Sequence, residues 1–151
     1  MWYSRVVADL SAIPDFISHY EQELLSAKKE CQVGGLVEKN ITLYSTCEHH
    51  LLPIIGRAHV AYISNGRVIG LSKMNRIVEY YAKRPQVQER LTIQVADELK
   101  EVLQTEHVAV VMDAKHLCVA SRGIKDISSA TVTASYHGKF NEMETRKNEF
   151  T

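Results

Sequence analysis

The sequence predicts an α+β domain whose sheet is mainly antiparallel. Segments rich in β-branched and aromatic residues lie on both sides of a helical middle, and the turn-forming pair Asn65-Gly66 follows one of them. Strands that gather before and after a pair of helices are typical of this class, in which helices cover one face of the sheet. A chain of 151 residues is long enough for one such domain with a sizeable core.

A helix is expected before the first strand. Pro14 stands near its start, and apolar residues then recur at helical spacing. These apolar positions are Ile13, Phe16, Ile17, Tyr20, Leu24 and Leu25. Because Gly34-Gly35 ends the region, we expect residues 1–34 to form a short N-terminal helical extension and residues 35–151 to form the main domain.

Two strands and a hairpin are expected next. The segments Leu36 to Ser45 and Arg57 to Ser64 have strand composition, with a loop between them. Asn65-Gly66 is the strongest short-range signal for a hairpin. We therefore expect Arg67 to Gly70 to pair back onto the second strand.

Two helices are expected in the middle of the chain. Ser72 is a favourable N-cap residue, and the helix after it must end near Pro85, which gives a helix to about Lys83. A second helix is expected from Val87 to about Gln104. The apolar positions of its inner face are Leu91, Val95, Leu99 and Val102.

Three further strands complete the predicted sheet. His107 to Asp113 and Lys115 to Arg122 are interpreted as a pair, and Ser129 to Tyr136 is a strand rich in β-branched residues. The tail from Asn141 is polar and is expected at the surface.

Charge and cysteine usage exclude several classes of function. Eighteen basic residues balance eighteen acidic ones, which argues against binding to nucleic acid or to a membrane surface. No apolar run approaches the ~18 residues of a membrane span, and no signal-peptide core follows the first residues. The three cysteines do not form a secreted disulfide pattern, and Cys31 is interpreted as a free thiol, so the cytoplasm is the expected location.

The segment from Cys47 to His50, taken with Cys118, predicts a metal site. Two thiolates and one imidazole can hold a zinc ion and leave the fourth tetrahedral position open, as in catalytic sites. His49 and His116 stand next to these residues, and imidazoles beside a metal-activated water suit hydrolysis near neutral pH. If residues 115–122 form a strand, then His116, Cys118 and Arg122 share one face.

Spacing alone leaves two other interpretations of these residues open. Buried structural cysteines are common, and a single C-x-x-H pattern is a weak signal. A fourth ligand such as His49 or His116 would also close the metal site and make it structural.

Two other groups of residues suit the binding of a nucleotide. Ser72, Lys73 and Arg76 open the first middle helix, where backbone N–H groups favour anions, and Arg122 could join them. A solvated basic face is the alternative. Glu89, beside Gln88, could accept two hydrogen bonds from a guanine edge or could simply favour the start of the second helix.

Four segments together resemble the GTP cyclohydrolase I family. They are Tyr44–Pro53, Val68–Arg76, Arg84–Leu91 and His116–Ile124, and the match covers about residues 35–151 in unbroken order. The resemblance implies the tunnelling fold, an antiparallel sheet with a helix pair on one side, whose sheets close into an oligomeric barrel. It also implies conversion of GTP to 7,8-dihydroneopterin triphosphate with release of formate, in active sites between subunits of a homo-oligomer, a decamer or a pentamer.

The resemblance also assigns roles to individual residues. The zinc ligands are matched by Cys47, His50 and Cys118. The acid–base histidines are matched by His49 and His116. The guanine-holding pair is matched by Gln88 and Glu89. Residues around the ribose and triphosphate are matched by Ser72, Lys73, Arg76 and Arg122, with Ser72 counted among the catalytic positions.

Some alternatives remain open at this point. The stretch before the match is shorter than the family's usual helical region, so we expect either the two-ring decamer or a single five-membered ring. A catalytically silent family member acting as a binding or regulatory subunit is one alternative function, and a tunnelling-fold enzyme for another purine or pterin is a second. The product could serve folate, biopterin or 7-deazaguanine synthesis.

Overall fold

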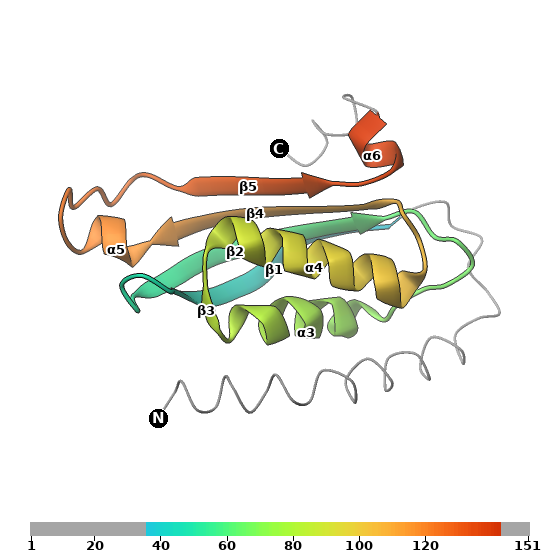
Figure 1. The fold of residues 1–151 in the computed structure, drawn as a ribbon, viewed down its shortest axis with the longest axis horizontal. Coiled ribbons are helices and arrows are strands. Elements are labelled where there is room, and N and C mark those ends of the chain that lie inside the picture. The colour runs from blue at the N-terminus through green and yellow to red at the C-terminus, as the bar shows by residue number, and fades with distance from the viewer. Residues whose placement is uncertain (1–35, 143–151) are drawn as a thin grey trace.

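Five strands form one sheet, and two helices lie side by side across one of its faces (Figure 1). The computed structural model describes residues 36–142, with only the backbone of Glu142. The strands are β1 (Leu36–Cys47), β2 (Pro53–Tyr62), β3 (Pro85–Gln86), β4 (Val108–His116) and β5 (Thr131–Tyr136). The helices are α3 (Leu71–Ala82), α4 (Gln88–Leu103), α5 (Leu117–Ala120) and α6 (Lys139–Glu142).

The strand order is β3-β1-β2-β4-β5, and every pair is antiparallel except the short parallel contact of β3 with β1. This arrangement confirms the predicted α+β class with an antiparallel sheet and a helix pair on one side. The helix predicted around Ile13 and most of the tail after Asn141 lie outside the described residues. Within residues 36–142, no helix is long and apolar enough to span a membrane.

The core lies between the sheet and the helix pair. Along β1, Ile41, Leu43 and Cys47 are buried in this core. Thr42 and Tyr44, which alternate with them, are exposed. The period of two in a half-buried strand produces this alternation. The inner face predicted for α4 is confirmed, because Leu91, Val95, Leu99 and Val102 are all buried.

The hairpin predicted at Asn65-Gly66 is wrong. Strand β2 ends at Tyr62, and residues 63–70 form an irregular connection to α3. Tyr62 already pairs with Leu36 on one side and with Val108 on the other, so β2 has no free edge for a returning strand. The Asn-Gly pair instead makes a local turn, in which Ser64 Oγ donates to the Arg67 carbonyl at 2.8 Å.

The predicted cap of the first middle helix is also wrong. The N-cap residue of α3 is Gly70, whose carbonyl accepts from Lys73 N at 2.9 Å, and Ser72 lies exposed in the first turn. The second helix is close to its prediction. It begins at Gln88 and ends before Gln104, which adopts the left-handed conformation (φ 51°).

The strand predicted for residues 115–122 is a further error. Strand β4 continues to His116, and the short helix α5 follows, with Ser121 N donating to the Leu117 carbonyl at 2.8 Å. Residues 115–122 cannot fold back beside β4 because β2 and β5 occupy its two edges. The strand predicted near the C-terminus is confirmed as β5, which begins at Thr131.

Gly56 is expected to be essential for the pairing of β2 with β4. A Cβ atom at this position would lie 2.1 Å from the Asp113 carbonyl oxygen and 2.7 Å from the Ala114 Cβ. We therefore expect Gly56→Ala to lower the free energy of unfolding by about 3 kcal/mol, because paired strands must move apart. Urea denaturation measures this change.

Gly70→Ala is the matched control, since the nearest atom to its new Cβ is 3.7 Å away. Gly70 already has a φ of −62°, which alanine adopts readily. Equal denaturation midpoints for the two variants would contradict the close-packing argument.

Candidate active site

Cys47, His50 and Cys118 come together at one end of the sheet. Cys47 ends β1, His50 lies in the turn that follows, and Cys118 lies on α5. Their ligand atoms all lie within 4.8 Å of one another. The turn is closed by Leu51 N donating to the Cys47 carbonyl at 2.8 Å and Cys47 N donating to the Leu52 carbonyl at 2.9 Å. Two donors from one turn and a third from a distant part of the sequence therefore converge on one point.

The three donors fit a zinc ion. Cys47 Sγ lies 3.8 Å from His50 Nδ1, against roughly 3.6 Å for a sulfur and a nitrogen bound to one tetrahedral zinc. Burial and the neighbouring Cys47 sulfur raise the pKa of Cys118. A bound cation would offset both effects and allow the two sulfurs to be thiolates at the same time. Within residues 36–142, the group has three members, and a tetrahedral ion held by three protein ligands would have a fourth position for water or substrate.

His116 is fixed beside this group by Gln88. Its Nε2 lies 2.6 Å from Gln88 Oε1. The amide orientation of Gln88 is determined by its nitrogen, which donates to the carbonyls of Met112 at 3.2 Å and Thr131 at 2.9 Å. The amide oxygen therefore accepts from His116 Nε2–H, and His116 Nδ1 is left as the proton acceptor. Burial lowers the pKa of His116, and the Glu89 carboxylate partly offsets this effect.

The predicted guanine pair is divided by the fold. Gln88 is buried, with a relative exposure of 1%, and its amide is fully engaged within the chain. Glu89, the next residue, is exposed in the first turn of α4. Of these two residues, Glu89 is the one whose side chain presents a polar group to solvent.

His49 and Arg122 border the same region. His49 is exposed on the turn, with its ring centroid 6.3 Å from that of His50. Arg122 is exposed after α5, and its charge acts to lower the pKa of Cys118, against the larger effect of burial. His116, Cys118 and Arg122 were predicted to share one face of a strand. That reason is wrong, because Cys118 lies on the helix α5.

The first half of α3, which carries Ser72, Lys73 and Arg76, lies away from the metal-binding end of the sheet. Strand β2 starts where Thr46 pairs with Pro53 and ends where Leu36 pairs with Tyr62, about 30 Å further along. Helix α3 begins near that second end and runs back toward the metal-binding turn (Figure 1). Ser72 is therefore about 15 Å along the helix from its end at Ala82. Within one chain, Ser72 and Lys73 therefore lie well away from the Cys47–His50 turn, and Arg76, about 9 Å along the helix from Ala82, lies between the two ends of α3.

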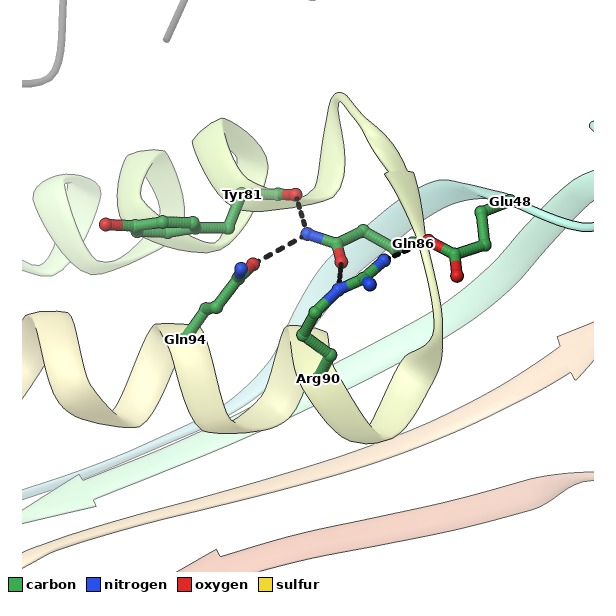
Figure 2. A network of polar contacts seen from close by, with 5 residues as sticks. All are labelled: Glu48, Tyr81, Gln86, Arg90 and Gln94. Carbon is green, nitrogen blue, oxygen red and sulfur yellow. Dashed lines mark hydrogen bonds and ion pairs between the residues drawn. The ribbon is translucent and has the colours of Figure 1, made fainter.

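Gln86 and Arg90, for which no role was predicted, lie beside the metal-binding turn (Figure 2). Gln86 pairs with Cys47 in the β3–β1 contact, and Arg90 contacts the Glu48 carboxylate. No periodicity or spacing signals a buried amide that joins several elements. Their place at the junction of the two helices, Gln86 just after Pro85 and Arg90 in the first turn of α4, was the one sign available in the sequence.

A solved structure shows the fold class of this chain, and a family profile shows its family. The archaeosine synthase QueF-Like in its apo form, a tunnelling-fold protein, superposes with a TM-score of 0.60 at 17% identity, over 72% of this chain and 97% of that chain. The profile of the GTP cyclohydrolase I family matches residues 4–151, and the chain belongs to this family.

Curated relatives of this chain carry the name GTP cyclohydrolase 1, among them proteins from two bacteria. The protein of Flavobacterium johnsoniae is 77% identical over 112 residues, which are 74% of this chain and 50% of that protein. The protein of Clostridium perfringens is 50% identical over 129 residues, which are 85% of this chain and 70% of that protein. The chain thus spans about half the length of the Flavobacterium relative.

Proposed function

We propose that this chain hydrolyses GTP to 7,8-dihydroneopterin triphosphate and formate, as its family membership suggests. The observation that carries the proposal is the convergence of Cys47, His50 and Cys118 on one point, with His116 two residues before Cys118 and the Glu89 carboxylate close enough to act on the pKa of His116. A zinc ion held by these three residues would supply Lewis-acid activation of the water that attacks C8 of the guanine. The two thiol ligands suit a reducing cytoplasm, which is the proposed location.

The two histidines are proposed to move the protons of the reaction. His116 can accept a proton at Nδ1, because Gln88 Oε1 holds Nε2–H and stabilises the charged ring that results. His49, exposed on the turn, is proposed to exchange protons with the guanine ring nitrogen as the five-membered ring opens. Rearrangement of the sugar needs further proton transfers and no redox cofactor.

Glu89 is proposed to hold the guanine. Its exposed carboxylate can accept hydrogen bonds from N1–H and from the 2-amino group, which adenine lacks in this arrangement. Gln88 is proposed to take part in this base site through His116 and the start of α4.

The triphosphate is proposed to lie between chains of a homo-oligomer, a pentamer or a decamer. Arg122 would come from the chain that holds the metal ligands, and Ser72, Lys73 and Arg76 from a neighbouring copy. The support is the position of α3, whose first turn lies far from the same chain's Cys47–His50 turn. Residues 35–151 are proposed as the catalytic domain, and the N-terminal residues 1–34 as an extension of it.

Turnover tests the proposed function directly. We expect the purified, zinc-loaded protein to convert GTP to a product that fluoresces after oxidation, with release of formate. Removal of the metal by a chelator should abolish turnover, and added zinc should restore it. Absence of product from a zinc-loaded oligomer would indicate a silent family member or an enzyme for another purine or pterin.

A further inference from the structure

Gln86 holds the metal-binding turn through its backbone. It forms the parallel contact of β3 with β1, in which Cys47 and Gln86 are register partners. Its carbonyl accepts from Glu48 N at 3.0 Å, directly after the proposed ligand Cys47. The first residue of the turn is thereby tied to the segment that leads into α4.

The side chain of Gln86 joins both helices. It is buried, and its Nε2 donates to the Tyr81 carbonyl at 2.9 Å, near the end of α3, and to Gln94 Oε1 at 2.8 Å, on α4. Its Oε1 accepts from Arg90 Nε at 3.2 Å. Since the nitrogen faces two acceptors and the oxygen faces a donor, only one orientation of the amide satisfies all three contacts.

Arg90 connects this amide to the metal-binding turn. Its Nη2 forms an ion pair with Glu48 Oε2, while its Nε donates to Gln86 (Figure 2). Glu48 stands between the proposed ligand Cys47 and His49. Glu48, Gln86 and Arg90 therefore form a closed ring, in which Glu48 is held by its backbone N–H and by its side chain.

We propose that Gln86 and Arg90 are positioning residues for the metal site. The ring fixes the Cys47–His50 turn against the first turn of α4, which carries Gln88 and Glu89; this inference rests on the function proposed above. Gln88 orients His116, and Glu89 is the proposed guanine acceptor, so the ring sets the distance between the metal and the base it acts on. Polar groups that support ligand-bearing segments in this way commonly change metal affinity when they are replaced.

The alternative role for the same contacts is to join the end of α3 to the start of α4, without effect on the metal. Zinc affinity separates the two roles, because a merely structural contact changes unfolding and leaves the metal dissociation constant unchanged. We therefore measure zinc competition with a chromophoric chelator, the absorption spectrum of the cobalt-substituted protein, and kcat and KM for GTP, below the unfolding temperature of each variant.

Gln86→Leu and Arg90→Met are expected to weaken zinc binding by about 10–100-fold and to lower kcat by a similar factor. KM should stay within about threefold, since the triphosphate contacts are untouched. Arg90→Lys should show an intermediate zinc affinity, because lysine keeps the charge that faces Glu48 and lacks the second donor that reaches Gln86.

Glu79→Gln is the matched control. It removes an exposed ion pair with Lys83 on α3, whose side chains are 59% and 60% exposed, and it touches none of the ring. Zinc affinity and the cobalt spectrum should not change in this variant.

Wild-type zinc affinity and cobalt spectrum in Arg90→Met, with only a lower denaturation midpoint, would overturn the inference. If Gln86→Leu does not fold, Arg90→Lys decides the question, and wild-type affinity in that variant would count against the ring. A wild-type protein that binds zinc but does not turn over GTP would refute the proposed function. The zinc affinities would still test the positioning role.

Discussion

Cys118→Ser is expected to remove stoichiometric zinc from the protein and to lower GTP turnover by at least about 10³-fold. A metal ion acting as a Lewis acid contributes several kcal/mol to the transition state, and each 1.36 kcal/mol corresponds to a factor of about ten in rate. A serine hydroxyl stays protonated near neutral pH, so it does not replace the thiolate. Cys118 is only half-buried on the short helix α5, and the exchange of sulfur for oxygen should leave the fold intact.

Elemental analysis of the purified variant and the fluorescence assay measure the two effects. Cys31→Ser is the control, because it removes the chain's third thiol and leaves Cys47, His50 and Cys118 in place. It should keep full zinc content and turnover. A Cys118→Ser protein with wild-type zinc content would show that the metal, if one is bound, is held elsewhere.

The fold was predictable where a sequence pattern is compatible with a single local structure. The period of 3.6 residues in Leu91, Val95, Leu99 and Val102 places one face of α4 in the core, whatever surrounds it. Asn65-Gly66 failed because a turn signal is local, whereas the availability of a strand edge depends on Leu36 and Val108, which are distant in the sequence. The false strand at residues 115–122 has the same origin, since β5 occupies the edge of β4.

The candidate site shows the same limit. Cys47 and His50 are close because only two residues of chain separate them, and only the complete fold brings Cys118 to them. The spacing of Gln88 and Glu89 predicts two neighbouring polar groups. It does not predict that one of them is buried and bonded to His116 while the other faces solvent. No role was predicted for Gln86 and Arg90, because their contacts join α3, α4 and the turn after β1, which the sequence does not show to be neighbours.

Mixing two impaired variants is expected to restore activity, because the proposed site takes residues from two chains. Lys73→Ala/Arg76→Ala removes two cations from the first turns of α3, and loss of charge-assisted contacts to the triphosphate should lower kcat/KM by about 10²-fold or more. Cys118→Ser removes the metal. Within one chain, Lys73 and Arg76 lie in the first half of α3, away from the end of the sheet that holds Cys118.

In a mixed oligomer, some sites combine the metal ligands of the Lys73→Ala/Arg76→Ala chain with the cations of the Cys118→Ser chain. Random assembly of equal amounts should give wild-type residues at about one quarter of the sites. The two proteins, carrying different affinity tags, are therefore unfolded together, refolded with zinc, and isolated by both tags before GTP turnover is measured. Mixing the folded oligomers without exchange of chains is the control and should restore nothing. Heteromers that contain both chains and zinc yet remain inactive would show that each chain builds its own site, and the position of α3 would then need another explanation.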